Sequence, residues 1–115
     1  MSEKLITRLF QIVDSSDWAN MPDVFCEDIV YERPGYPPIV GIEQLLHFYK
    51  HVRILGSGKH HLEQVVIEGN HGGCFGRFVG QTKDHSEVDE LFADMYTFEN
   101  GKIKHRRSYF FRPAV

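Results

Sequence analysis

Hydrophobic side chains in the first half of the chain recur with the period of an α-helix. Between residues 2 and 15 they fall on one helical face: Leu5, Ile6, Leu9, Phe10, Ile12 and Val13. A short helical segment is predicted next, over 18–25, with Pro22 limiting its length. The same periodicity returns after Gly41 and predicts a third helix, which the glycines at 56 and 58 are expected to end.

The second half of the chain carries the patterns of β-strands separated by turns. After a short strand over 29–33 and a proline-rich stretch, long strands are predicted over 62–67, 74–82, 88–98 and 103–111. Asn100-Gly101 predicts a tight hairpin between the last two strands, because both residues tolerate positive φ. The order α-α-β-α-β-β-β-β predicts an α+β fold, with the helices packed on one side of a curved antiparallel sheet.

The strand predicted over 88–98 is apolar on both of its faces. Aromatic side chains share one face and smaller side chains share the other: Phe92, Tyr96 and Phe98 against Leu91, Ala93 and Met95. Because the helices cover only one face of the sheet, the other face needs a second cover. A second copy of the chain supplies one, which predicts a homodimer formed through the sheet.

Composition limits the class of protein further. The chain has 115 residues, of which 42% are hydrophobic and 25% charged, so one domain with one core is expected. The net charge of −3 disfavours nucleic-acid binding, and no apolar run reaches the ~18 residues of a membrane span. Cys26 and Cys74 form no C-x-x-C motif, so reduced thiols and a cytoplasmic location are expected, with a single disulfide as the alternative.

Two acidic side chains share the aromatic face of the strand over 88–98. Asp94 lies among the aromatic residues, where loss of water favours either its neutral form or a paired cation. Two interpretations are therefore open: a hydrogen-bond donor or proton shuttle, or a buried aspartate that an arginine holds in the sheet. Glu90 shares this face and is a candidate base, with an exposed glutamate near the start of the strand as the alternative.

Histidine is the usual proton carrier near neutral pH, and the chain has seven. His60 and His61 precede the strand over 62–67, so one of them is expected to point inward, and His61 is the candidate for a direct role. His47 and His51 have the spacing of a zinc-binding helix, but no third ligand is evident. We interpret that pair as a solvated helix face and predict no metal site.

Several segments also carry a family signature: 12–17 (IVDSSD), 31–34 (YERP), 41–49 (GIEQLLHFY), 93–98 (ADMYTF) and 100–103 (NGKI). In this order and spacing they resemble the ketosteroid isomerase and SnoaL-like polyketide cyclase branch of the nuclear transport factor two-like superfamily. The resemblance covers nearly the whole chain and implies a single SnoaL-like domain over residues 1–115. It implies a cystatin-like, cone-shaped sheet whose concave face carries the three helices and encloses one deep, mostly apolar pocket.

The resemblance transfers only part of the known catalytic machinery. In the isomerases, a carboxylate base ends the first strand, and a tyrosine and a protonated aspartate hold the oxyanion. Asp94 occupies the position of that aspartate, and Tyr49 that of a supporting tyrosine. The base position is Arg33 and the oxyanion tyrosine is Leu9, while the last strand lacks the aspartate of the cyclases. Steroid isomerisation by the familiar mechanism is therefore not expected.

The resemblance also implies which residues face the pocket. The substrate-binding candidates are Tyr31, Arg33, Trp18, Phe92, Tyr96, Arg106 and Phe110. Arg33 cannot act as a base, but it can bind a carboxylate or enolate by two parallel hydrogen bonds. The alternative is an ion pair of Arg33 with Asp94 or Glu90. A shift of one residue in the first strand would instead turn Glu32 inward as the base.

Taken together, these features predict a small-molecule pocket protein without metal or organic cofactor. We expect a cyclase, isomerase or dehydratase type of enzyme that transfers protons on an apolar carbonyl or carboxylate substrate. Asp94 and Tyr49 would stabilise the oxyanion, with His61 or Glu90 as the base. A non-catalytic ligand carrier with the same pocket is the main alternative, and an interaction module that uses the sheet surface is a third.

Overall fold

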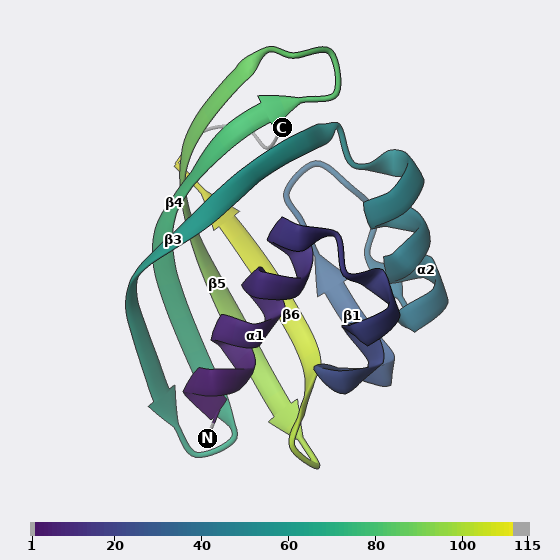
Figure 1. Cartoon of the computed structure of the whole chain (residues 1–115). Coiled ribbons are helices and arrows are strands. Elements are labelled where there is room, and N and C mark those ends of the chain that lie inside the picture. Colours follow the sequence, from purple (N-terminus) through teal and green to yellow (C-terminus); the bar gives the residue numbers. More distant parts are fainter. Residues whose placement is uncertain (1, 112–115) are drawn as a thin grey trace.

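A curved six-stranded sheet and the helices beside it make up residues 2–111, the part of the chain that the computed structural model describes (Figure 1). Three helical elements precede or interrupt the first strands: α1 (Ser2–Ser15), the 3₁₀ helix η1 (Trp18–Asp23) and α2 (Ile42–His47), which continues as a π-helical turn, η2 (Phe48–Val52). The strands are β1 (Phe25–Glu32), β2 (Ile39–Val40), β3 (Leu55–Glu68), β4 (His71–Thr82), β5 (Glu87–Glu99) and β6 (Lys102–Phe110).

The sheet has the strand order β2-β1-β6-β5-β4-β3. Every neighbouring pair is antiparallel except β1 and β6, which run parallel, with Tyr31 opposite Arg106. The α+β class is confirmed, and the parallel pair and the two-residue strand β2 are additions to the predicted antiparallel sheet. Between the two strands of the parallel pair the chain passes through β2, α2, η2 and the strands β3, β4 and β5 before β6 returns beside β1. This pairing brings Tyr31 and Arg106 together at the site described below.

The boundary between the third helix and the next strand was predicted wrongly. The helix ends at Val52 and β3 already begins at Leu55, so the glycines at 56 and 58 lie inside a strand. They were expected to end the helix because glycine usually breaks regular structure. Here they belong to an irregular stretch of β3, where the pairing register with β4 shifts between Leu55 and Ser57.

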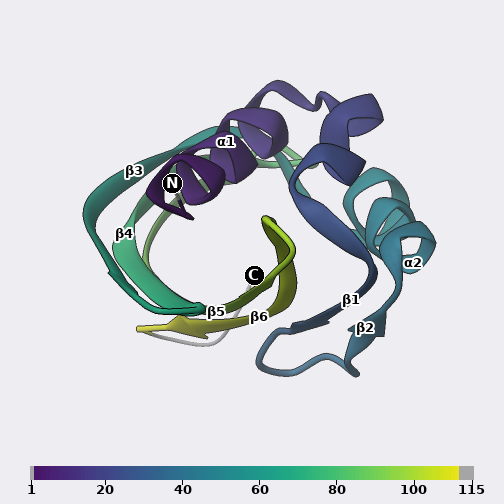
Figure 2. The same ribbon diagram turned by 90° about the horizontal axis from the view of Figure 1, so that it is seen from below.

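Glycines in β4 allow β3 and β4 to approach each other closely where β3 bulges. A Cβ atom on Gly76 would lie 2.1 Å from the carbonyl oxygen of His61, and one on Gly80 would lie 2.1 Å from that of Ser57. Any larger residue at these positions would therefore collide with the neighbouring backbone. Bulges opposite glycines bend strands, and the strands curve around a concave side in Figure 2.

Helices occupy the concave side of the sheet. In Figure 2, α1 lies inside the arc of the strands and α2 lies beside β1. The apolar face of α1 is buried, as its periodicity predicted: Ile6, Leu9, Phe10, Ile12 and Val13. Along β5, the even-numbered residues from Val88 to Phe98 are buried, so the predicted alternation is confirmed. The described residues include no helix with the length and apolar character that crossing a membrane requires.

Candidate functional site

A small polar hollow lies between the concave face of the sheet and the helices. Its volume is about 30 Å³, which is room for about two water molecules. Small-molecule pockets usually measure roughly 300–1,000 Å³, so side chains nearly fill the deep apolar pocket that the resemblance implied. The hollow is lined by Tyr31, Arg33, Tyr49, Arg53, Leu55, His60, Phe78, Glu90, Phe92, Asp94, Arg106, Ser108 and Phe110.

Most of the predicted site residues meet around this hollow: Tyr31, Arg33, Tyr49, Glu90, Phe92, Asp94, Arg106 and Phe110. Three predicted residues do not line it. His61 is exposed, Tyr96 is buried behind Asp94, and Trp18 lines a neighbouring cavity. The hollow therefore brings together eight of the eleven predicted residues, while the roles assigned to them stay predictions.

Asp94 is held by Arg106 at the centre of the site. Its side chain is 1% exposed, and its Oδ2 accepts hydrogen bonds from Arg106 Nε at 3.0 Å and Nη2 at 2.9 Å. The Tyr96 hydroxyl donates to the same oxygen at 2.8 Å, and the Ser108 hydroxyl donates to Oδ1 at 2.6 Å. Of the two interpretations of Asp94, this geometry matches the buried aspartate paired to an arginine. Its contacts are those of an acceptor, and they leave it no hydrogen to donate to a ligand.

A directed chain of hydrogen bonds links Asp94 to Arg33. The single hydroxyl hydrogen of Ser108 is donated to Asp94, so the Tyr31 hydroxyl, 2.8 Å from Ser108 Oγ, must be the donor in that contact. Tyr31 in turn accepts a hydrogen bond from Arg33 Nη1 at 3.1 Å. Each tyrosine or serine hydroxyl in this chain therefore has a fixed orientation.

The Tyr49 hydroxyl lines the hollow and has a hydrogen to donate to a ligand. It accepts a hydrogen bond from Arg106 Nη1 at 2.8 Å, which leaves its own hydrogen for a second partner. Burial raises the pKa of Tyr49, although Arg106 opposes the shift, so the hydroxyl stays protonated near neutral pH. A neutral hydroxyl that faces a hollow is a suitable donor to an oxyanion.

The register of β1 places Tyr31 and Arg33 inward and Glu32 outward. Arg33 is 8% exposed, and four aromatic rings surround its guanidinium with centroids 5.2–5.9 Å from Cζ: Tyr31, Tyr36, Phe48 and Phe110. Glu32 accepts hydrogen bonds from Arg107 Nε at 2.8 Å and pairs with His105 at 2.7 Å. These partners hold the pKa of the Glu32 carboxyl below its usual value. The alternative register, with Glu32 as an inward base, is therefore wrong.

His60 lines the hollow and pairs with Asp14, which lies outside it, and the sequence did not predict this pair. His60 Nδ1 lies 2.5 Å from Asp14 Oδ1, and the backbone N–H of His60 donates to Asp14 Oδ2 at 2.9 Å. The ring packs among Phe10, Phe78 and Phe92, with centroids 4.6–5.4 Å away. Burial lowers the pKa of His60, and Asp14 opposes part of that shift. The imidazole is therefore neutral at pH 7, with Nε2 as its acceptor when Nδ1–H donates to Asp14.

His60, and not His61, is the inward histidine of β3. The expectation that one of the two faces inward is confirmed, but the choice of His61 was wrong, since His61 is exposed. Extending the period-two pattern backwards from Leu62 would have selected His60. The alternation was not applied to these two histidines, because the helix was predicted to end at the glycines and the strand to begin only at Leu62. Asp14 is visible in the sequence only as the end of α1, and no local pattern joins it to His60.

The other candidate ligands and thiols are not assembled into a site. Within residues 2–111 no group of three or more histidine, cysteine or acidic side chains is placed to hold a metal ion. His47 and His51 lie with ring centroids 5.2 Å apart on an exposed helix surface. Cys26 and Cys74 are both free thiols, so the disulfide alternative is wrong, and burial raises the pKa of Cys74 to about 11.

The curved sheet, the helices on its concave face and the enclosed polar hollow define a small α+β pocket protein. The SnoaL-like domain model matches residues 6–106. The chain therefore belongs to the SnoaL-like family, as the sequence resemblance predicted. A comparison with curated protein sequences finds no match for this chain.

Solved structures with the same fold share little sequence with this chain. A protein from a Jannaschia species, provisionally described as a SnoaL-like polyketide cyclase, is 16% identical, with a TM-score of 0.83 over 94% of this chain and 83% of its own. An NTF2-like protein of unknown function from Burkholderia pseudomallei is 13% identical, with a TM-score of 0.85 over 94% and 88%. An LEH-like epoxide hydrolase from M. tuberculosis is 14% identical, with a TM-score of 0.80 over 93% and 80%. At these identities the likeness establishes the fold alone.

Proposed function

We propose that this protein is an enzyme that moves a proton on a small carbonyl or carboxylate compound, with His60 as the base. The observation that carries the proposal is the pairing of His60 with Asp14 at the edge of a hollow that also presents Tyr49 and Arg33. A histidine whose tautomer is fixed by a carboxylate is a recurring arrangement for general base catalysis. The family supports the broader class, since its fold is shared by the cyclase-like and epoxide hydrolase-like proteins above.

In the proposed step, His60 removes a proton from the substrate and later returns it. Nε2 of neutral His60 takes a proton from the carbon next to the carbonyl group, and the electrons of the broken C–H bond move into an enolate. Tyr49 donates a hydrogen bond to the enolate oxygen, and the cation of Arg33 stabilises its charge. The protonated His60 then returns the proton to another carbon or to a leaving oxygen, which restores the neutral ring.

The remaining acidic residues take different places in this proposal. Asp94 is a positioning residue, because it holds Arg106, which in turn contacts Tyr49. Glu90 lines the hollow at 8% exposure and is the second candidate base. His61, the other base predicted from the sequence, is exposed and does not line the hollow.

Turnover on a panel of compounds tests the proposal. β-Keto acids, enones and epoxides would be incubated with the protein in deuterium oxide and followed by nuclear magnetic resonance. We expect at least one carbonyl compound to incorporate deuterium at its α-carbon faster than in buffer alone. The absence of enzyme-dependent exchange or conversion across the panel contradicts the proposal.

A non-catalytic ligand carrier is the second candidate function. It is favoured by one observation, namely that both oxygens of Asp94, the acid expected to move protons, accept hydrogen bonds within the protein. A carrier would release every bound compound unchanged and without deuterium incorporation, so the same panel separates the two functions.

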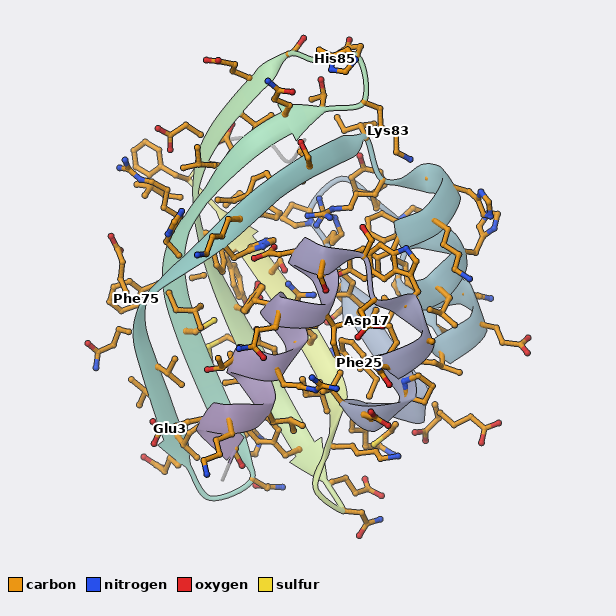
Figure 3. All side chains as sticks on the ribbon, viewed as in Figure 1. Glu3, Asp17, Phe25, Phe75, Lys83 and His85 are labelled. Carbon is orange, nitrogen blue, oxygen red and sulfur yellow. The ribbon has the colours of Figure 1, made fainter. Side chains whose placement is uncertain are left out.

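We also propose that the outer face of the sheet forms a homodimer. Large apolar side chains stand exposed on that face in neighbouring strands: Val66, Phe75, Leu91, Met95 and Tyr109. Phe75 lies opposite Ala93, and Ala93 opposite Tyr109, so these side chains form a continuous patch across β4, β5 and β6. Phe75 points away from the side of the sheet that carries the helices (Figure 3). Contiguous apolar patches of this kind mark interaction surfaces, and a second copy of the same face is the occupant we propose.

A charge in this patch is expected to separate the dimer. Met95 is 50% exposed on the central strand β5, so Met95→Glu would bury two carboxylates in the proposed interface. Sedimentation velocity should show the mass of a dimer for the unmodified protein and of a monomer for the variant. Gln11→Glu, which adds the same charge at an exposed position on α1, outside the proposed interface, should leave the dimer intact. A monomeric unmodified protein, or a Met95→Glu variant that stays dimeric, overturns the proposal.

A further inference from the structure

A second cavity shares part of its lining with the hollow. Its volume is about 230 Å³, and it lies between the end of α1, the segment that joins η2 to β3, and β4. Tyr49, Arg53, Leu55 and Phe78 line both cavities. These four shared side chains are called the partition, and the hollow becomes continuous with the outer cavity if one of them moves.

Arg53 is the partition residue whose place is hardest to explain as packing. The residue is partly exposed but its Nε is buried, and Cζ lies 5.4 Å from the Tyr49 ring and 5.6 Å from the Phe78 ring. Within residues 2–111, Arg53 forms no ion pair, and its buried Nε has no hydrogen-bond partner. Burying an arginine in this way is costly unless an anion joins it. The cation is thus positioned for a partner that the described chain does not supply.

The charge of the outer cavity favours an anion as that partner. Lys50 and Lys83 line it together with Arg53, while its one acidic residue, Asp14, is already bonded to His60. Lys83 lies where the loop after β4 approaches the start of β3 (Figure 3), and its backbone N–H donates to the carbonyl oxygen of Ile54 at 2.7 Å. The excess of positive charge would raise the local concentration of anionic compounds.

The rings around the outer cavity favour a flat apolar group on that anion. Trp18 stacks on Tyr49, with ring centroids 5.2 Å apart and an interplanar angle of 22°, and Phe78 also lines the cavity. Aromatic walls of this kind stabilise a planar ring by offset or edge contacts. The joined cavities would approach roughly 300 Å³, the lower end of small-molecule sites, which suits a one-ring compound.

We infer that the outer cavity binds the carboxylate of a compact aryl acid, and that Arg53 swings from its seat between Tyr49 and Phe78 to pair with it. The movement opens the partition, so the ring reaches the hollow that carries His60. This inference deepens the proposed function, on which it rests for the fate of the bound compound. Binding itself needs no turnover, and it can be measured separately.

Trp18 provides a direct probe, because it is the only tryptophan in the chain and lines the outer cavity. Its fluorescence would be titrated with benzoate and with benzamide, which has nearly the same shape but no charge. We expect benzoate to bind at least tenfold more tightly than benzamide. Arg53→Met should abolish this preference, and Arg53→Lys should restore part of it. Arg77→Met, which removes an exposed arginine that lines neither cavity, should bind as the unmodified protein does.

Several outcomes would overturn the inference. They are equal affinity for the two compounds, no saturable response to either, or an Arg53→Met variant that keeps the preference for benzoate. If Arg53→Met does not fold, the affinities of the unmodified protein for benzoate and benzamide test the inference without it. Charge-selective binding without any turnover would contradict the proposed function and preserve this inference, while turnover without charge selectivity would do the reverse.

Discussion

Replacing Asp94 with alanine is expected to lower the free energy of unfolding by about 3–5 kcal/mol, because it leaves the cation of Arg106 buried without its partner. Arg106 and Asp94 are 5% and 1% exposed in their side chains, so water cannot replace the lost carboxylate. The hydroxyl groups of Tyr96 and Ser108 lose their acceptor as well. Urea unfolding followed by circular dichroism measures the change.

An exposed ion pair on the same sheet provides the control for this prediction. Arg77 and Asp89 lie 3.5 Å apart on β4 and β5, with both side chains more than half exposed. Asp89→Ala should change stability by less than about 0.5 kcal/mol, as surface substitutions usually do. Adding Arg106→Met to Asp94→Ala should recover part of the loss, because the unpaired charge is then gone. An Asp94→Ala protein as stable as the Asp89→Ala protein contradicts the assignment of Asp94 as a structural anchor.

The second large effect concerns catalysis. His60→Gln should lower kcat/KM by roughly 10²–10⁴-fold on any compound that the panel identifies, because the general base is lost while a side chain of similar size remains. The adjacent residue gives a matched control, since His61 is exposed and His61→Gln should leave kcat/KM unchanged. Steady-state kinetics on purified, folded variants measures both.

Removing Asp14, the partner of His60, should change the pH dependence of kcat/KM. Asp14 raises the pKa of His60 against the larger effect of burial, so Asp14→Asn should lower that pKa further. The acidic limb of the kcat/KM profile would then move to lower pH, and the rate would fall because the ring tautomer is no longer fixed. Equal rates for the His60→Gln and His61→Gln variants would assign the base elsewhere, with Glu90→Gln as the next variant to test.

The fold was predictable because its main patterns are local. The helical face of α1 and the alternation along β5 both follow from the spacing of apolar residues, and both are present in the structure. The start of β3 was not predictable, because Gly56 and Gly58 serve an irregular, bulged strand there and not a helix end. Glycine alone does not distinguish a helix end from a bulged strand, because both structures use its backbone freedom.

The site was predictable only where one strand determines it. Alternation brought Asp94 and Glu90 to the same face, and the register of β1 followed the family pattern for Arg33. The partner of Asp94 depends on the register between β5 and β6, which places Tyr96 opposite Arg106. The pairing of His60 with Asp14 joins residues 46 positions apart, from a helix and a strand. Such contacts depend on how the elements pack, which no sequence period encodes.

The ring nitrogens of His60 report most directly on the proposed base. Nuclear magnetic resonance of nitrogen-15 in the histidine rings, recorded across a pH titration, gives both the tautomer and the pKa. We expect a ring that is neutral at pH 7, carries its proton on Nδ1 toward Asp14 and titrates below the ordinary value of 6.5. A ring that is charged at pH 7, or that carries its proton on Nε2, would leave no acceptor facing the hollow and would contradict the proposed chemistry.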